Sequence, residues 1–164
     1  MLSKRTFIAG GIVMASVGGL INSLRGKGNA AQAQDYPVKK TDAEWRKQLS
    51  PEAFHVLREH GTERAGTSPL NREKRAGTFS CAGCDQPLFK ADTKFESGTG
   101  WPSFFDPMPG AIGTTDDTAF FMTRTEVHCS QCGGHLGHVF PDGPPPTGQR
   151  YCMNGVSLKF EADA

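Results

Sequence analysis

The chain has 164 residues, of which 37% are hydrophobic and 21% are charged, a composition typical of one ordinary soluble domain rather than of a disordered or multi-pass membrane protein. Its 18 basic residues nearly balance 17 acidic ones, but four of the basic residues lie ahead of the first acidic residue. Taking these 4 from 18 leaves 14 basic against 17 acidic residues. Such a mildly acidic domain lacks the positive charge that binds a phosphate backbone, so nucleic acid is not an expected partner.

Residues 1–33 have the features of an export signal. Lys4 and Arg5 precede a glycine-rich apolar run, and Ala33 fits a cleavage site. The run is shorter than the roughly 20 apolar residues of a membrane span, so we expect no stable anchor. The order Ser-Lys-Arg-x-Phe-Ile resembles a twin-arginine signal in which Lys4 replaces the first arginine. We therefore expect export to the periplasm; the alternative is an uncleaved signal that tethers the protein to the membrane.

The mature part, residues 34–164, is expected to begin with two short helices. Thr41 and Glu44 have the spacing of a capping box, which predicts a helix that begins there. Ser50, followed by a proline, predicts the start of a second helix, which Gly61 can end.

The rest of the mature part predicts a mainly β domain built of antiparallel sheets. Residues 62–78 show no periodicity and are expected to form an extended loop. After them, short β-type segments alternate with Gly and Pro, at residues 78–81, 88–89, 118–128, 138–140 and 150–160. Five phenylalanines are expected in the core, namely Phe104, Phe105, Phe120, Phe121 and Phe160.

Four of the five cysteines form two Cys-x-x-Cys pairs. These are Cys81 with Cys84 and Cys129 with Cys132. Together they supply four thiolates for one tetrahedral zinc ion, and four sulfur ligands leave no open position, so the predicted site is structural. The alternative is two disulfides, which an exported protein could form. A disulfide within so tight a pair closes only a short loop, which favours zinc.

The fifth cysteine, Cys152, is a candidate nucleophile. If residues 150–154 form a strand, its two-residue period places Arg150, Cys152 and Asn154 on one face. A guanidinium on the same face favours the thiolate. A lone cysteine can instead be an inert buried side chain, but the polar neighbours favour catalysis.

A second polar cluster lies upstream in the segment Gly133-Gly134-His135-Leu136-Gly137-His138. Two histidines three residues apart can bind metal, transfer protons or simply pack. Because the four cysteines already satisfy a metal, we interpret His135 and His138 as proton donors to a substrate of Cys152.

The chain resembles the methionine sulfoxide reductase B family, which repairs the R epimer of methionine sulfoxide in proteins after oxidative damage. The resemblance covers the chain from about residue 41 to residue 164. It is carried, in chain order, by the first Cys-x-x-Cys pair, FESGTGWPSFF, the second Cys-x-x-Cys pair, HLGHVFPDGPPP and RYCMNGVSLKF. It implies a mainly β fold of two antiparallel sheets with short N-terminal helices and a structural zinc opposite the active site.

The resemblance also implies roles for individual residues. Cys152 would attack the sulfoxide, His135 and His138 would protonate the departing oxygen, and Asn154 would hold the substrate network. Arg150 would lower the pKa of the thiol. Two further residues, Trp101 and Phe140, would form the walls of the site that bind the substrate methyl group. Read without the resemblance, Trp101 could equally be a core residue.

One departure from the family concerns regeneration of the thiol. Many members have a resolving cysteine where this chain has Thr99, and the other four cysteines are assigned to zinc. We therefore expect an external reductant, a thioredoxin-like protein or a small thiol, to attack the sulfenic acid. A monomer is expected. Two other functions are weighed: a zinc-stabilised binding module with an inert Cys152, and a thiol peroxidase.

Overall fold

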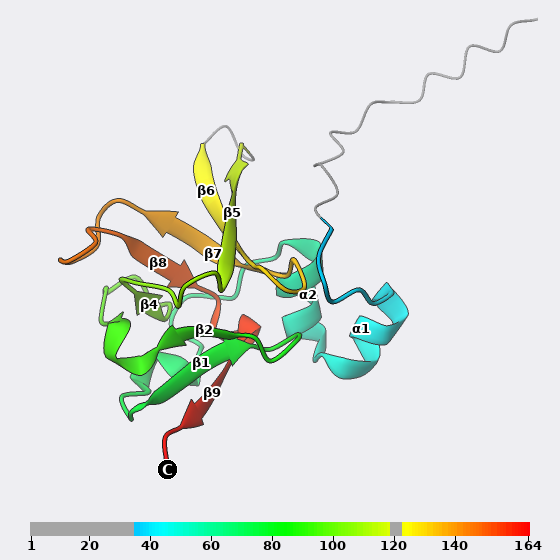
Figure 1. The fold of residues 1–164 in the computed structure, drawn as a ribbon, viewed down its shortest axis with the longest axis horizontal. Helices are drawn as coiled ribbons and strands as arrows, with labels where there is room; N and C mark the ends of the chain where they lie inside the picture. The colour runs from blue at the N-terminus through cyan, green and yellow to red at the C-terminus, as the bar shows by residue number, and fades with distance from the viewer. Residues whose placement is uncertain (1–34, 119–122) are drawn as a thin grey trace, which may run out of the picture. The chain divides into compact units, whose positions relative to one another are not determined.

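The computed structural model describes residues 35–118 and 123–164, which form two short helices and two antiparallel sheets (Figure 1). The smaller sheet has the strand order β2-β1-β9, and the larger has the order β3-β4-β8-β7-β6-β5. The elements are α1 (Asp42–Gln48), α2 (Pro51–Glu59), β1 (Gly77–Cys81), β2 (Pro87–Lys90), β3 (Lys94–Phe95), β4 (Ser103–Phe104), β5 (Ile112–Asp117), β6 (Arg124–Cys129), β7 (His135–Phe140), β8 (Arg150–Met153) and β9 (Leu158–Ala162). The predicted mainly β fold with two antiparallel sheets is confirmed.

Both helices begin where their caps predict. The Thr41 hydroxyl accepts from the Glu44 backbone N–H at 3.3 Å, and the Glu44 carboxylate accepts from the Thr41 N–H at 2.8 Å, which completes the capping box. Ser50 caps α2 through the Ala53 N–H, with Pro51 in the first turn. At the other end, His60 rather than Gly61 adopts the left-handed conformation, with φ at 55°. No helix within residues 35–118 and 123–164 has the length and apolar character to cross a membrane.

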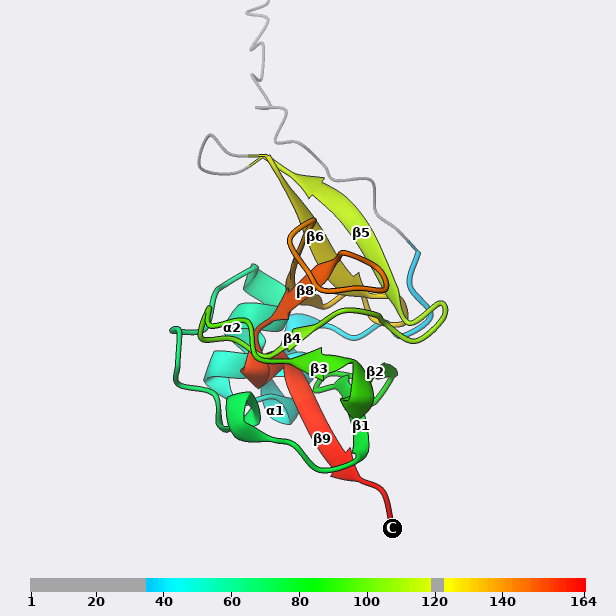
Figure 2. The ribbon, with the colours of Figure 1, turned by 90° about the vertical axis from the view of Figure 1, so that its left-hand side faces the viewer.

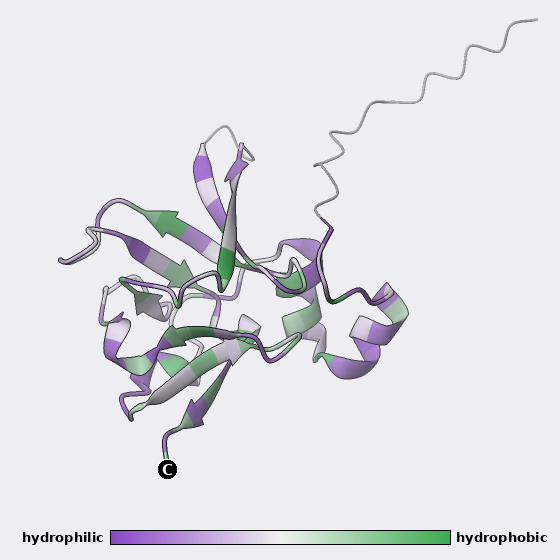
Figure 3. Cartoon of the chain, viewed as in Figure 1, coloured by the Kyte–Doolittle hydropathy of each residue, from purple (hydrophilic) through white to green (hydrophobic). Residues whose placement is uncertain are grey.

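The core lies between the two sheets, and aromatic rings from both of them meet there. Phe104 of β4 stacks on Phe89 of β2 with ring centroids 4.3 Å apart, and Phe79 of β1 meets Phe104 edge-on at 4.9 Å. All three rings are fully buried. Figure 2 shows the two sheets from a second side. Figure 3 shows that hydrophobic and hydrophilic residues alternate along β7 and β8. The sheet that carries β8 is therefore fixed against β1 and β2 through its inner face.

Three of the five phenylalanines expected in the core belong to the described residues, and two of these three pack in it. Phe104 is fully buried, and Phe160 is half-buried against Phe79. Phe105 is half-buried and lies outside the core cluster, which corrects that expectation. Phe120 and Phe121 fall outside the described residues.

Two predicted strand segments need correction. Residues 150–160 do not form one strand: β8 ends at Met153, a single 3₁₀ turn follows, and β9 pairs in the other sheet. The turn redirects the chain from the larger sheet to the smaller one. The segment that the sequence predicts as one strand therefore contributes a strand to each sheet. In the segment 118–128, the strand β6 starts only at Arg124. The sequence does not predict the preceding strand β5 at Ile112–Asp117, because four of its six residues are Thr or Asp and three of these are exposed. The expected loop also gives way to β1 at Gly77 and contains a 3₁₀ turn at Pro69–Arg72.

Candidate active site

A small cavity opens beside β8, and Cys152 lies in its wall. Its volume is about 210 Å³, which suits a side chain rather than a large cofactor. Five of the residues that the sequence predicted for the site contribute to the wall of this cavity. They come from β7, from β8 and from two loops. The lining residues are Thr62, Trp101, Arg124, Gly137, His138, Phe140, Cys152 and Asn154.

The register of the larger sheet brings polar side chains into one row. His138 of β7 lies directly opposite Cys152 of β8, Glu126 of β6 lies opposite His138, and Ser103 of β4 lies opposite Cys152. Residues directly opposite each other share a face of the sheet, with Cβ atoms about 4.5–5.5 Å apart. The pairing of β7 with β8 therefore places the His138 imidazole next to the Cys152 thiol, although the two residues are far apart in the sequence.

A loop that the sequence left without a role holds two of the lining residues in place. The indole Nε1 of Trp101 donates to the Glu63 carbonyl at 2.9 Å, and the Glu63 backbone N–H donates to the Asn154 side-chain oxygen at 2.9 Å. The Asn154 amide in turn donates to the Leu136 carbonyl at 3.0 Å, and its side chain is buried. Asn154 follows β8 rather than belonging to it. The backbone of Glu63 thus holds two residues of the cavity lining, Trp101 and Asn154.

Arg150 is oriented by a carboxylate. Its Nε and Nη2 donate to the two oxygens of Asp142 at 2.9 and 3.0 Å, a bidentate pair, while its guanidinium lies 4.5 Å from the Phe140 ring centroid. The Asp142 partner first, and the Cys152 sulfur after it, raise the pKa of Arg150 above its usual range. A permanent positive charge therefore lies on the strand that carries the thiol.

His138 is tied to charges that the sequence analysis missed. Its Nε2 lies 2.9 Å from the Asp117 carboxylate, which also forms a 2.6 Å ion pair with Arg124. Burial lowers the pKa of His138, and the hydrogen bond to Asp117 only partly opposes this. Asp117 and Arg124 lie opposite each other in the register of β5 and β6. The sequence does not predict this ion pair, because it depends on the pairing of β5 with β6 and neither residue belongs to a recognisable motif.

His135 lies apart from the cavity lining. It is buried at 3% exposure, and its Nδ1 lies 2.8 Å from a Glu126 oxygen that also lies 3.2 Å from His60 Nδ1. Its ring centroid is 5.4 Å from that of His138. Of the two predicted proton donors, only His138 reaches the cavity wall directly.

Thr99 lies near the candidate nucleophile. Its hydroxyl is 3.9 Å from the Cys152 sulfur and is held by Ser97, whose hydroxyl is 2.8 Å from both Thr99 and Ser103. The other four cysteines form a separate cluster, so among the described residues no second thiol lies at this position.

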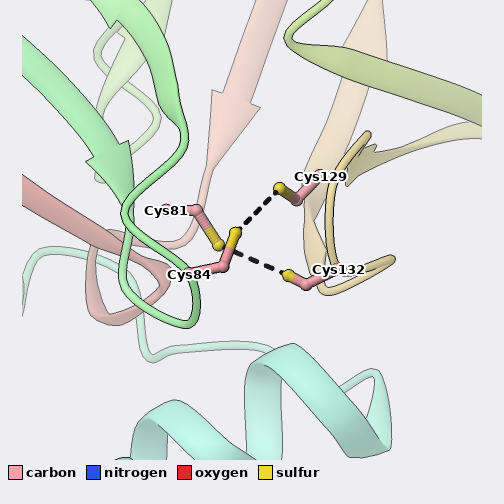
Figure 4. Close-up of side chains that lie close together, drawn as sticks. All are labelled: Cys81, Cys84, Cys129 and Cys132. Atoms are coloured by element: carbon pink, nitrogen blue, oxygen red, sulfur yellow. Dashed lines mark hydrogen bonds between the residues drawn. The ribbon is translucent and has the colours of Figure 1, made fainter. Parts of the chain in front are cut away.

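The four remaining cysteines converge at the ends of β1 and β6 (Figure 4). The sulfurs of Cys81 and Cys132 are 3.7 Å apart, and those of Cys84 and Cys129 are 3.5 Å apart. All four are free cysteines, because a disulfide bond would join sulfurs at about 2.05 Å. In a tetrahedral tetrathiolate with metal–sulfur bonds of about 2.3 Å, neighbouring sulfurs lie about 3.8 Å apart. The cluster fits such a metal ion, which would join the two sheets.

Comparison with known proteins gives one consistent result. The SelR domain family matches residues 49–162. The chain is 59% identical over 125 residues to "Peptide methionine sulfoxide reductase MsrB" of Agrobacterium fabrum, a match that covers 76% of this chain and 93% of the relative. It is 58% identical over 125 residues to the protein of the same name in Pseudomonas putida, covering 76% and 94%, and 55% identical over 127 residues to that of Methanosarcina barkeri, covering 77% and 89%.

Proposed function

Because the chain belongs to the SelR domain family of peptide methionine sulfoxide reductases, we propose that Cys152 reduces the R epimer of methionine sulfoxide in oxidised proteins. The observation that supports this proposal most directly is the cavity in which Cys152, His138 and Trp101 meet. A nucleophile, a titratable donor and an apolar wall are the three parts that the reaction needs.

In the first step the Cys152 thiolate attacks the sulfoxide. The sulfur–oxygen bond of the substrate breaks, its oxygen passes to the cysteine sulfur with a proton, and methionine leaves while Cys152 becomes a sulfenic acid. The substrate sulfur is reduced by two electrons and the cysteine sulfur is oxidised by two. Arg150, held by Asp142, lies on the strand of the reacting sulfur and stabilises its negative charge.

The proton in this step comes from His138. Its side chain lines the cavity directly opposite Cys152, and an imidazole whose pKa is lowered by burial releases its proton readily once charged. The His135 ring lies edge-on to the His138 ring, with centroids 5.4 Å apart, and supports its orientation. Asn154 is held by the Glu63 N–H and the Leu136 carbonyl and lies where a bound substrate can contact it.

The apolar end of the substrate is bound by aromatic rings. Trp101 and Phe140 both line the cavity, and the hydrogen bond from Trp101 to the Glu63 carbonyl fixes its ring. A methyl group packs favourably on such a surface, whereas a peroxide does not need one. This difference favours sulfoxide over peroxide as the substrate.

The sulfenic acid returns to the thiol through an external reductant. A first thiol attacks the sulfenic sulfur and releases water, and a second thiol reduces the resulting mixed disulfide. Thr99, close to Cys152, supplies no thiol for this step. A thioredoxin-like protein or a small thiol therefore acts as the electron donor.

The metal of the four-cysteine cluster is zinc in this proposal. Zn²⁺ favours four thiolates in a tetrahedron, and the sulfur spacing of the cluster fits one. When bound, it supplies a cross-link between the knuckles at Cys81–Cys84 and Cys129–Cys132 and no reacting group.

The site of action in this proposal is the periplasm. The support is the basic and apolar pattern of residues 1–33, which lie outside the described residues. Export after folding, as the twin-arginine route allows, would let the cysteines bind zinc before they meet an oxidising compartment. The mature protein acts as a monomer without a membrane anchor.

The test compares turnover of the R and S epimers of a methionine sulfoxide peptide by zinc-loaded protein with dithiothreitol. We expect reduction of the R epimer alone and its loss in Cys152→Ser. Turnover of the S epimer would refute the epimer assignment, and an active Cys152→Ser variant would refute the nucleophile. A folded, zinc-containing protein with no activity on either epimer would instead favour a binding module, and faster turnover of peroxide would favour a peroxidase.

A further inference from the structure

Three metal-ligating side chains converge outside the cavity lining, and one of them is His135, whose ring supports His138 in the proposed reaction. His60, His135 and Glu126 each offer one ligand atom, a ring nitrogen or a carboxylate oxygen, and these three atoms lie within 4.8 Å of one another. The Glu126 oxygen is 2.8 Å from His135 and 3.2 Å from His60. The three residues come from the end of α2, from β6 and from the start of β7, so the fold rather than the sequence brings them together.

The spacing of these atoms is close to that of metal ligands. With bonds of about 2.0–2.1 Å, neighbouring ligand atoms of a tetrahedral Zn²⁺ lie about 3.3 Å apart. The two observed distances differ from this value by a few tenths of an ångström, which side-chain rotation can supply. Two imidazoles and one carboxylate are also a recurrent ligand set for divalent transition metals.

The backbone conformation at His60 places its ring beside Glu126 and His135. His60 ends α2 in the left-handed conformation, a strained state for a residue other than glycine, although the next residue is Gly61. In this position its ring lies 5.2 Å from the His135 ring. In this conformation both imidazoles reach the same Glu126 carboxylate oxygen.

Access and charge also suit a metal ion. The His60 side chain is 64% exposed, so an ion can enter from solvent, whereas His135 is buried. Burial raises the pKa of Glu126, but hydrogen bonds from His135 and His60 outweigh this and hold the pKa below its usual range, so the carboxylate carries its charge. Arg58 and Asp117 are the other charged groups that act on His60, with opposite signs.

We infer that His60, Glu126 and His135 form a second metal site, which binds a borderline divalent ion such as Zn²⁺, Co²⁺ or Ni²⁺. Three protein ligands leave at least one position for water, so the ion exchanges with solvent. In this respect the site differs from the closed cluster of four cysteines, in which no ligand position remains. Without a metal, Glu126 bridges the two rings by hydrogen bonds, and the ion takes the place of the shared protons.

The experiment titrates Zn²⁺ into the full chain, already zinc-loaded at the four cysteines, and measures the heat of binding. Cys152→Ser serves as the parent protein, because it removes the thiol that could bind zinc in the cavity. We expect one further equivalent of Zn²⁺ to bind. His60→Gly should weaken this binding at least tenfold, and it should fold, because glycine adopts the left-handed conformation without strain.

Two further variants complete the test. Glu126→Gln removes the charged ligand and should weaken binding to a similar degree. The matched control His55→Ala removes an exposed histidine of α2 that pairs with Glu59, and it should bind like the parent. Absence of a second equivalent in the parent would overturn the inference, and so would equal affinity in His60→Gly. Because binding heat is the readout, the result is independent of whether the protein reduces sulfoxides.

Discussion

Gly137 offers a direct test of how closely β7 and β8 must approach for catalysis. It lines the cavity, and a Cβ atom at this position would lie 2.1 Å from the Cys152 carbonyl oxygen. This overlap becomes an ordinary contact of 3.4 Å only if the two strands separate by about 1.3 Å, because the opposing atoms belong to the backbone. Gly137→Ala therefore moves Cys152 away from His138, which lies directly opposite it.

The expected effect follows from this displacement. A shift of about 1 Å in a reacting group lowers the rate roughly 100-fold, so kcat/KM for the R sulfoxide should fall by about this factor. Overpacking should also lower the free energy of unfolding in urea by about 1–3 kcal/mol. Gly83→Ala is the control, because its Cβ would meet Trp45 at 3.5 Å, an ordinary contact. A Gly137→Ala protein with kcat/KM within threefold of wild type would refute the reasoning.

Three further predictions concern redox chemistry, pH and metal. Thr99→Cys places a second thiol where the hydroxyl now lies 3.9 Å from the Cys152 sulfur, so one turnover without reductant should give a disulfide between them by mass spectrometry; two free thiols after turnover would contradict this. Glu126→Gln should destabilise the protein more at pH 6 than at pH 8.5 in urea unfolding. The hydrogen bond to Glu126 raises the pKa of His60. The stability that this pair contributes is therefore complete below pH 6.5 and is lost as the pH rises through the raised pKa. Equal losses of stability at both pH values would contradict this prediction. Removal of the metal by a chelator under reducing conditions should lower the melting temperature by more than about 10 °C and added Zn²⁺ should restore it, whereas an unchanged value would show that the four cysteines need no ion.

The parts of the site that the sequence predicted are those with a local signal. The capping box at Thr41 and the paired Cys-x-x-Cys motifs depend on neighbouring residues, and the structure forms the cap and brings the four sulfurs together. Arg150 and Cys152 share a strand, so a two-residue period was enough to place them on one face. Asn154 reaches the cavity by a different route, as the residue after the strand.

The residues that were missed depend on strand register, which no local pattern reveals. Asp117 meets His138 only because β5, β6 and β7 pair in a particular alignment, and four of the six residues of β5 are Thr or Asp. Glu63 lies in a segment without periodicity, yet it holds Trp101 and Asn154. His135 has the same sequence context as His138, but its side chain turns to Glu126. Side-chain direction at the start of a strand is set by packing rather than by sequence spacing.

The way in which the cysteine cluster is assembled has a consequence for how the protein matures. Cys81 and Cys132 are 51 residues apart, and β1, which carries Cys81, pairs with β9 near the other end of the described chain. Contacts over such separations form late in folding, because the intervening loop must close first. Until then the thiols of each knuckle are exposed and only three positions apart. An oxidant that reaches the unfolded chain can join Cys81 to Cys84, and two oxidised pairs can no longer supply four thiolates. For the zinc-bound protein that we propose, the metal must therefore bind before the two cysteine pairs oxidise.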